Sequence, residues 1–353
     1  LCMVLLYTTL GGMVSVVVLD YIQFVVLAFG LVIASVLSIR HLGWTNIVET
    51  VTREMGDSGF DPFDEAGFGW SYVLWMFFMG LVSCAVWQTA VIRACSAKDT
   101  ATVRKMYCLS SIGFLIRFLI PYFFGICALV FIANSSSLRT VFLSAEGKAN
   151  PDLSLRAMPF YLSQILPTGI VGIVTAGMLA AFMSTHDSYL LCWSSVLTQD
   201  VVAPWFQRDL SSKTRLLLTR IFILAIGVFI LVWGLWFPLR QDLWDYMAIS
   251  GAIYSIGGFT LLAFGLYWKR ASRTGAYLAL FTGILAVLGL SKVQELCAPM
   301  LAPIKARFGI EGDISSAVIG LLVLVLAIVL MIAGSLLWPD RERNRYHAER
   351  VES

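Results

Sequence analysis

Four ionisable side chains lie within long apolar stretches of this sequence, namely Asp20, Arg117, His186 and Asp187. A charge near the centre of a bilayer costs at least about 2.5–3.5 kcal/mol on insertion scales. Such a side chain is therefore expected to face a partner, water or an ion rather than lipid. These four residues are the first candidates for function.

Asp187 belongs to a stripe of oxygen-bearing residues. At about 100° per residue, one helical face carries Ala181, Ser184, Thr185, Asp187 and Ser188. Hard cations bind carboxylate and carbonyl oxygens, and transporters expose carbonyls where helices break, so Na⁺ is the natural ligand for this face. The alternative is that the hydroxyls bond a neighbouring helix or the carbonyl four residues back. Both interpretations stay open at this point.

His186 projects away from this stripe. Residues i and i+2 of one helix do not face each other, which argues against a hydrolytic triad of Ser184, His186 and Asp187. A packing role for His186 is favoured, although its position beside Asp187 leaves proton coupling open. The pattern does not predict an enzyme.

Asp20 and Asp187 are expected at similar depth in the bilayer. They lie about nine and twelve residues from the ends of their helices on the same side of the membrane, at 1.5 Å per residue, so they could flank one cation. Alternatively, Asp20 pairs with Arg117, because buried charges are normally paired. The planar fork of Arg117 also suits a carboxylate-bearing solute.

The elements that carry these residues are apolar helices. The chain of 353 residues is 59% hydrophobic and 13% charged, with a mean hydropathy of +0.82, which excludes a soluble enzyme. Residues 1–10 resemble the end of a further span. Eight stretches are long enough to cross a bilayer as helices: 13–38, 69–92, 107–133, 166–199, 216–237, 245–268, 274–291 and 315–338. We therefore predict an all-α integral membrane protein.

The distribution of basic residues predicts its topology. With loops 93–106, 200–220, 269–273 and the basic tail 339–353 in the cytoplasm, fifteen of 25 Lys and Arg residues lie inside, nine lie outside and Arg117 lies within a span. We expect a multi-pass protein of the cell membrane with a cytoplasmic C-terminus. The lipid bilayer is then a partner and nucleic acid is not, because the net charge of +3 is scattered.

Two further expectations concern the loops and the N-terminus. The acidic segment 39–68 is predicted to be a solvated extracellular loop rather than an ordered gate. The chain begins at Leu1 inside an apolar stretch, which suggests the C-terminal part of a longer protein.

Four ordered segments carry a family resemblance. YTTLGGMVSVVVLDYIQ (7–23), WQTAVIRACSAKD (87–99), the stretch from LAAFMST to SSVLTQD (179–200) and FGLYWKRASRTGAYLALFTG (264–283) resemble the sodium/solute symporter family. The resemblance implies a LeuT-like inverted-repeat transporter fold, N-terminally incomplete, with about eight full transmembrane helices and part of a ninth. The symporter domain would span 1–338 and end before the tail 339–353.

Within that domain, the resemblance assigns residues 1–268 to the end of core helix 4 through core helix 10, and 269–338 to peripheral helices. The principal sodium site of the family joins core helix 1 to core helix 8, where Ala181, Ser184 and Thr185 would be ligands. Some members hold a second sodium between core helices 5 and 8.

That second site maps onto Asp20, Ser184, Asp187 and Ser188, although a serine rather than Asp187 would be expected. Arg117 stands where sugar-transporting relatives have a substrate-facing lysine, so it becomes the candidate solute contact. Further residues that match the family are Gln88 and Arg93, for which a gating or structural role is expected.

We therefore expect a sodium-coupled symporter that imports a small organic solute, and Arg117 favours a carboxylate-bearing one. Proton coupling through Asp187 and His186 on the same fold is the first alternative. A transport-like sensory membrane domain is the second.

Overall fold

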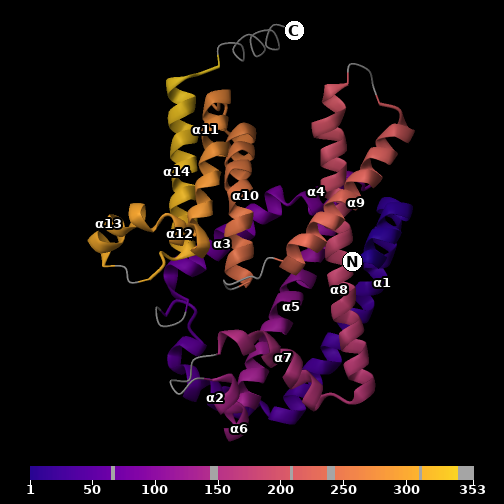
Figure 1. The fold of residues 1–353 in the computed structure, drawn as a ribbon, viewed down its shortest axis with the longest axis vertical. Helices are drawn as coiled ribbons and strands as arrows, with labels where there is room; N and C mark the ends of the chain where they lie inside the picture. Colours follow the sequence, from indigo (N-terminus) through magenta and orange to yellow (C-terminus); the bar gives the residue numbers. More distant parts are fainter. Residues whose placement is uncertain (65–67, 144–149, 207–209, 237–242, 310–311, 341–353) are drawn as a thin grey trace. The chain divides into compact units, whose positions relative to one another are not determined.

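The computed structural model describes residues 1–64, 68–143, 150–206, 210–236, 243–309 and 312–340, which are helical with short connections and contain no strand. Figure 1 shows the helices. They are α1 (Cys2–Leu42), α2 (Trp44–Met55), α3 (Gly69–Val86), α4 (Gln88–Cys95), α5 (Thr100–Ala133), α6 (Ser136–Phe142), α7 (Pro151–Ile165), α8 (Thr168–Val196), α9 (Ser212–Trp236), α10 (Leu243–Tyr267), α11 (Arg273–Gly283), α12 (Ser291–Leu296), α13 (Ala298–Phe308) and α14 (Ser316–Leu337).

Seven helical stretches in these ranges are long and apolar enough to cross a membrane. They confirm the all-α membrane class. The predicted span 274–291 differs, because α11 and the 3₁₀ segment Ile284–Gly289 form a shorter apolar helix, Arg273–Gly289. α9 illustrates the outward face, where Leu217, Val228 and Phe229 are exposed. A bilayer would cover such a surface.

The helices form two compact units. Unit 1 comprises Leu1–Phe60 and Ile92–Phe237, and unit 2 comprises Asp61–Val91 and Pro238–Ser353. In unit 2, α3, α10 and α14 share an apolar core. Its buried members include Trp75 from α3, Ile249 and Ile256 from α10, and Val323 and Ala327 from α14.

In unit 1, α1 is broken near its N-terminus. Gly12 adopts φ +60° and ψ −151°, a conformation that favours glycine. The break frees the Thr9 carbonyl, which accepts a 3.0 Å hydrogen bond from Nε of Arg220 on α9. Residues 2–11 are thus a separate helical segment, in agreement with the sequence interpretation of residues 1–10.

The longer part of α1 packs closely against α8. A Cβ atom on Gly177 would lie 3.0 Å from the Cα of Leu27, and one on Gly30 would lie 3.4 Å from the Cα of Val174. Because the paired numbers fall on α8 as they rise on α1, the two helices are antiparallel (Figure 1). The close packing of α1 against α8 brings Asp20 of α1 near the polar residues 184–188 of α8.

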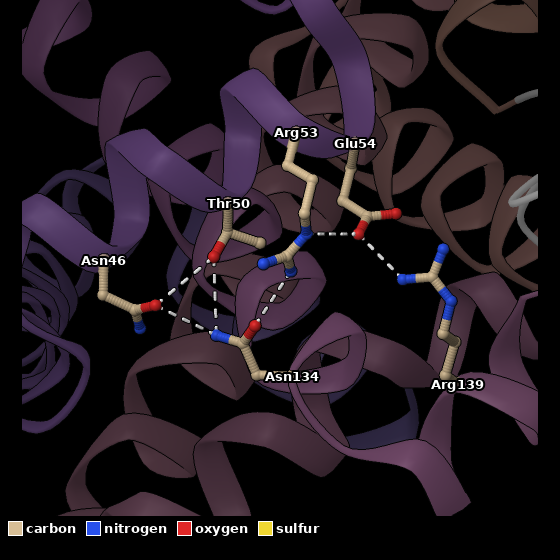
Figure 2. A network of polar contacts seen from close by, with 6 residues as sticks. All are labelled: Asn46, Thr50, Arg53, Glu54, Asn134 and Arg139. Carbon is tan, nitrogen blue, oxygen red and sulfur yellow. Dashed lines mark hydrogen bonds and ion pairs between the residues drawn. The ribbon is translucent and has the colours of Figure 1, made fainter.

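The segment 39–68 is more ordered than expected. It contains α2, which places Asn46, Thr50 and Glu54 on one face at intervals of four residues. Figure 2 shows this face bonded to Asn134, the C-cap of α5, and to Arg139 on α6.

Individual contacts in this network are well defined. Arg139 Nη1 lies 2.7 Å from Glu54 Oε1, Arg53 Nη2 lies 3.0 Å from Asn134 Oδ1, and Asn134 Nδ2 lies 3.1 Å from Asn46 Oδ1. The prediction of a solvated loop was therefore wrong for residues 44–55. The helical spacing of the polar residues, together with the apolar residues Ile47 and Val51, which are buried, was the sequence signal for this helix. The acidic composition of the segment obscured that signal.

Candidate functional site

A polar cluster lies within unit 1, where α1, α4 and α8 meet. Arg93 of α4 places Nη2 2.5 Å from Oδ2 of Asp20 and 2.6 Å from Oγ of Ser188. The Ser188 hydroxyl in turn donates to the Ser184 carbonyl at 2.7 Å, and Asp187 Oδ1 lies 3.2 Å away. The structure thus brings Asp20, Asp187 and Ser188 together, as the sequence predicts.

The second carboxylate is held by the short N-terminal segment of α1. Tyr7 donates a 2.6 Å hydrogen bond from its hydroxyl to Oδ2 of Asp187. Tyr7 and Asp20 would lie about 20 Å apart in a straight helix, yet Tyr7 bonds Asp187 directly and Asp20 is joined to the next residue, Ser188, through Arg93. The break at Gly12 is what folds them onto the same place.

Several side-chain oxygens of α1 are buried without a hydrogen-bond partner in the described structure. They are Oδ1 of Asp20, Oε1 of Gln23 and the hydroxyl oxygens of Thr8 and Thr9. A buried acceptor without a partner costs about 1–3 kcal/mol. These oxygens are therefore candidates for a cation or proton to satisfy.

The charges of the cluster do not cancel when both carboxylates are ionised. Asp20 and Asp187 supply two negative charges, and Arg93, which stays protonated in proteins, supplies one positive charge. Asp187 is fully buried, so an uncompensated charge there would be costly. One monovalent cation or one proton would neutralise the cluster.

The remaining predicted sodium ligands also lie together on α8. Ser184 and Thr185 both donate to the carbonyl of Ala181, at 3.2 and 2.9 Å. The local hydrogen bonds of the alternative interpretation are thus present. Each hydroxyl oxygen keeps lone pairs after donating its proton, so the arrangement remains compatible with an ion.

His186 has a local role in the structure. Its Nδ1 lies 2.8 Å from the Phe182 carbonyl, and the rings of Phe182 and His186 are 4.0 Å apart. Because a carbonyl can only accept, Nδ1 carries the proton. This geometry agrees with the packing role favoured from the sequence.

Arg117 is not the partner of Asp20. The carboxylate of Asp20 is paired with Arg93 instead, and Arg117 is exposed on α5 with its guanidinium carbon 5.1 Å from the Phe114 ring centre. The alternative in which Asp20 pairs with Arg117 was therefore wrong. The role of Arg117 towards a solute stays a prediction.

Sequence reasoning missed Tyr7 and the ion pair of Arg93. Tyr7 stands in a segment that looked like the end of another helix, and nothing in the spacing indicates that it faces Asp187. Arg93 was assigned to a basic loop and to a gating or structural role. Its location on α4, directly after an apolar run, was the available signal.

Comparison with known proteins agrees with the family resemblance seen in the sequence. Residues 1–283 match the sequence model described as "Sodium:solute symporter family". The sodium/proline symporter 2 of Staphylococcus saprophyticus is 26% identical over 330 residues, which cover 89% of this chain and 59% of that protein. The sodium/glucose cotransporter 4 of Danio rerio is 23% identical, with coverages of 94% and 54%.

A solved structure supports the fold. A Na⁺-coupled sialic acid symporter in a substrate-bound, outward-open state superimposes with a TM-score of 0.69 at 18% identity, covering 96% of this chain and 66% of that one. The likeness confirms the expected LeuT-like transporter fold. The chain spans between half and two thirds of the length of these relatives.

The family comprises transporters rather than enzymes, which agrees with the expectation from the α8 stripe. The match extends over most of the chain and includes α1, α4 and α8, the three helices that carry the polar cluster. The chain belongs to the sodium:solute symporter family.

Proposed function

We propose that this protein is a sodium-coupled secondary active symporter that imports a small organic solute. The observation that carries the proposal is the oxygen-rich face of α8, which Arg93 joins to the carboxylate of Asp20 on α1. These groups lie on helical stretches that are long and apolar enough to cross a membrane, and ionisable residues within such stretches typically mark an ion pathway.

The first proposed sodium position is formed by Ala181, Ser184 and Thr185. Two hydroxyls converge on one carbonyl, so three oxygens lie within hydrogen-bond distances of 2.9 and 3.2 Å. Oxygen ligands suit a hard cation. The family resemblance assigns the other ligands of this position to core helix 1.

A second proposed cation position lies between α1 and α8, at Asp20, Ser184, Asp187 and Ser188. Its two carboxylates attract positive charge, of which Arg93 supplies one. The remaining negative charge supports the alternative, a proton on Asp187, because this carboxylate is fully buried. Sodium coupling through the first position and proton coupling through Asp187 are distinguished by the ion that uptake requires.

Coupling follows from differential binding. If Na⁺ binds better to the outward-open state, it shifts the protein towards that state, and solute and ion then cross together as one helix bundle rocks against the other. Each positive charge moved inward gains about 2.3 kcal/mol per 100 mV of membrane potential. This energy would support concentrative uptake into the cytoplasm, with the C-terminus on the cytoplasmic side.

For the solute, Arg117 is the proposed contact. It is exposed on α5 beside Phe114, and its fork can hold a carboxylate with two hydrogen bonds. The names of the relatives include both proline, which carries a carboxylate, and glucose, which does not. A panel of solutes is therefore needed, and an Arg117→Lys variant should weaken uptake of a carboxylate more than that of a sugar.

The test is uptake by the full-length protein in proteoliposomes under an inward Na⁺ gradient, against carboxylates, amino acids and sugars. Accumulation that requires Na⁺ and survives a protonophore supports the proposal. Uptake that continues with choline in place of Na⁺ but collapses with a protonophore would instead establish proton coupling. Ligand binding without any flux would favour a sensory domain.

A further inference from the structure

The guanidinium of Arg93 occupies the place between α1 and α8 where a bridging cation would sit. One nitrogen, Nη2, contacts the Asp20 carboxylate at 2.5 Å and the Ser188 hydroxyl at 2.6 Å. Nη2 thus joins an oxygen of α1 to an oxygen of α8, as a bridging cation would.

This arrangement differs from an ordinary structural ion pair. A pair would be neutral, whereas Arg93 here contacts a cluster with two carboxylates, because Asp187 adjoins Ser188 and lies 3.2 Å from its hydroxyl. In addition, Oδ1 of Asp20 is buried without a hydrogen-bond partner. The contacts thus keep the pattern of a cation site, with a side chain in the ion's position.

Arg93 also comes from a different element than the oxygens it contacts. It lies on the short helix α4, whereas Asp20 is on α1 and Ser188 is on α8. Its side chain is 30% exposed, in contrast to the fully buried carboxylate of Asp187. The guanidinium is therefore at the more accessible end of the cluster, and Asp187 is at the buried end.

We infer that Arg93 acts as a tethered cation at this site, in competition with Na⁺. While Arg93 is in place, Na⁺ is coupled only through the position at Ala181, Ser184 and Thr185. Loss of the guanidinium leaves Asp20 and Asp187 without compensation, and a sodium ion then binds between Asp20 and Ser188. The inference rests on the proposed sodium coupling and specifies how many ions are coupled.

The test compares three variants with the wild type. Arg93→Gln removes the charge, Arg93→Lys keeps it, and the double variant Arg93→Gln with Asp20→Asn removes the charge together with its acceptor. Solute uptake is measured as a function of Na⁺ concentration in proteoliposomes. We expect a hyperbolic dependence for the wild type, for Arg93→Lys and for the double variant, and a sigmoidal dependence for Arg93→Gln alone.

Thermal unfolding of the purified proteins keeps the inference testable if Arg93→Gln does not transport. A ligand that binds only the folded state raises its stability with concentration. Sodium chloride should therefore raise the unfolding temperature of Arg93→Gln more than that of the wild type or the double variant, whereas choline chloride should not.

A sigmoidal wild-type curve would overturn the inference. So would Arg93→Gln protein that transports with an unchanged hyperbolic curve, or that gains no Na⁺-specific stabilisation beyond the wild type. These results would leave sodium coupling itself intact. Wild-type uptake that needs no Na⁺ would instead contradict the proposed function.

Discussion

The hydroxyl of Tyr7 donates a 2.6 Å hydrogen bond to the carboxylate of Asp187, which joins residues 180 positions apart. Asp187 is fully buried on α8, so the bond fixes the orientation of a carboxylate that water does not reach. The break at Gly12 makes this contact possible, since it brings Tyr7 to the level of Asp20. A local backbone feature thereby assembles the cluster.

Tyr7→Phe should destabilise the protein and impair transport. The substitution leaves a buried carboxylate oxygen without its donor, at a cost of about 1–3 kcal/mol. Thermal unfolding in detergent and solute uptake are the measurements. Tyr21→Phe is the matched control, because Tyr21 is 71% exposed on the same helix and should change neither. Equal stability of both variants would show that the Tyr7 bond contributes nothing.

Ser184→Ala and Thr185→Ala should each raise the Na⁺ concentration for half-maximal transport. Loss of one oxygen ligand is expected to weaken binding about tenfold, equivalent to ~1.4 kcal/mol. Ser195→Ala is the control, because Ser195 lies on the same face of α8, about three turns further on, and bonds the Leu191 carbonyl at 2.7 Å. Unchanged Na⁺ dependence in both test variants would remove these residues from the site.

Gly12→Ala should cost about 1–3 kcal/mol, because alanine is strained at φ +60° and ψ −151°. The loss should appear as a lower unfolding temperature together with weaker Na⁺ activation, since the break positions Tyr7. Gly113→Ala is the control, because a Cβ atom there, within the helix α5, meets nothing within 4 Å. If Gly12→Ala were as stable and as active as Gly113→Ala, the bend would not depend on glycine.

Glu54→Gln should lower stability at neutral pH by about 1 kcal/mol or less, in line with partly exposed ion pairs. The hydrogen bond from Arg139 lowers the pKa of Glu54 in the folded state. Its contribution is thus complete above the ordinary glutamate pKa near 4.5 and is lost as the pH falls through the lower folded value.

The difference in unfolding temperature between wild type and Glu54→Gln should therefore shrink on acidification. Glu49→Gln is the control, because Glu49 is exposed on the same helix. A difference that stayed constant from neutral pH to below pH ~4 would exclude ionised Glu54 as its source.

The membrane spans were predictable because long apolar runs have few alternatives to a helix in lipid. The oxygen face of α8 was predictable for a similar reason, since residues 181–188 are positioned by the helical period alone. The depth argument also placed Asp20 and Asp187 correctly at one level. These predictions depend on local geometry, which the sequence determines.

Features that depend on tertiary contacts were not predictable. The pairing of Asp20 with Arg93 rather than Arg117 depends on where α4 packs, and the Tyr7 contact depends on a bend at a single glycine. Helix α2 was missed because its polar residues suggested solvent, whereas they bond Asn134 and Arg139 from other elements.

Equilibrium binding of radioactive sodium to the purified full-length protein tests the central claim most directly, because it requires no knowledge of the solute. We predict saturable binding that unlabelled Na⁺ displaces, that persists in Ser195→Ala and that is lost when Ser184 and Thr185 are both replaced by alanine. Equal Na⁺ affinity of the wild type and of the variant that lacks both the Ser184 and the Thr185 hydroxyl would contradict the account. An absence of saturable Na⁺ binding in the wild type would contradict it as well.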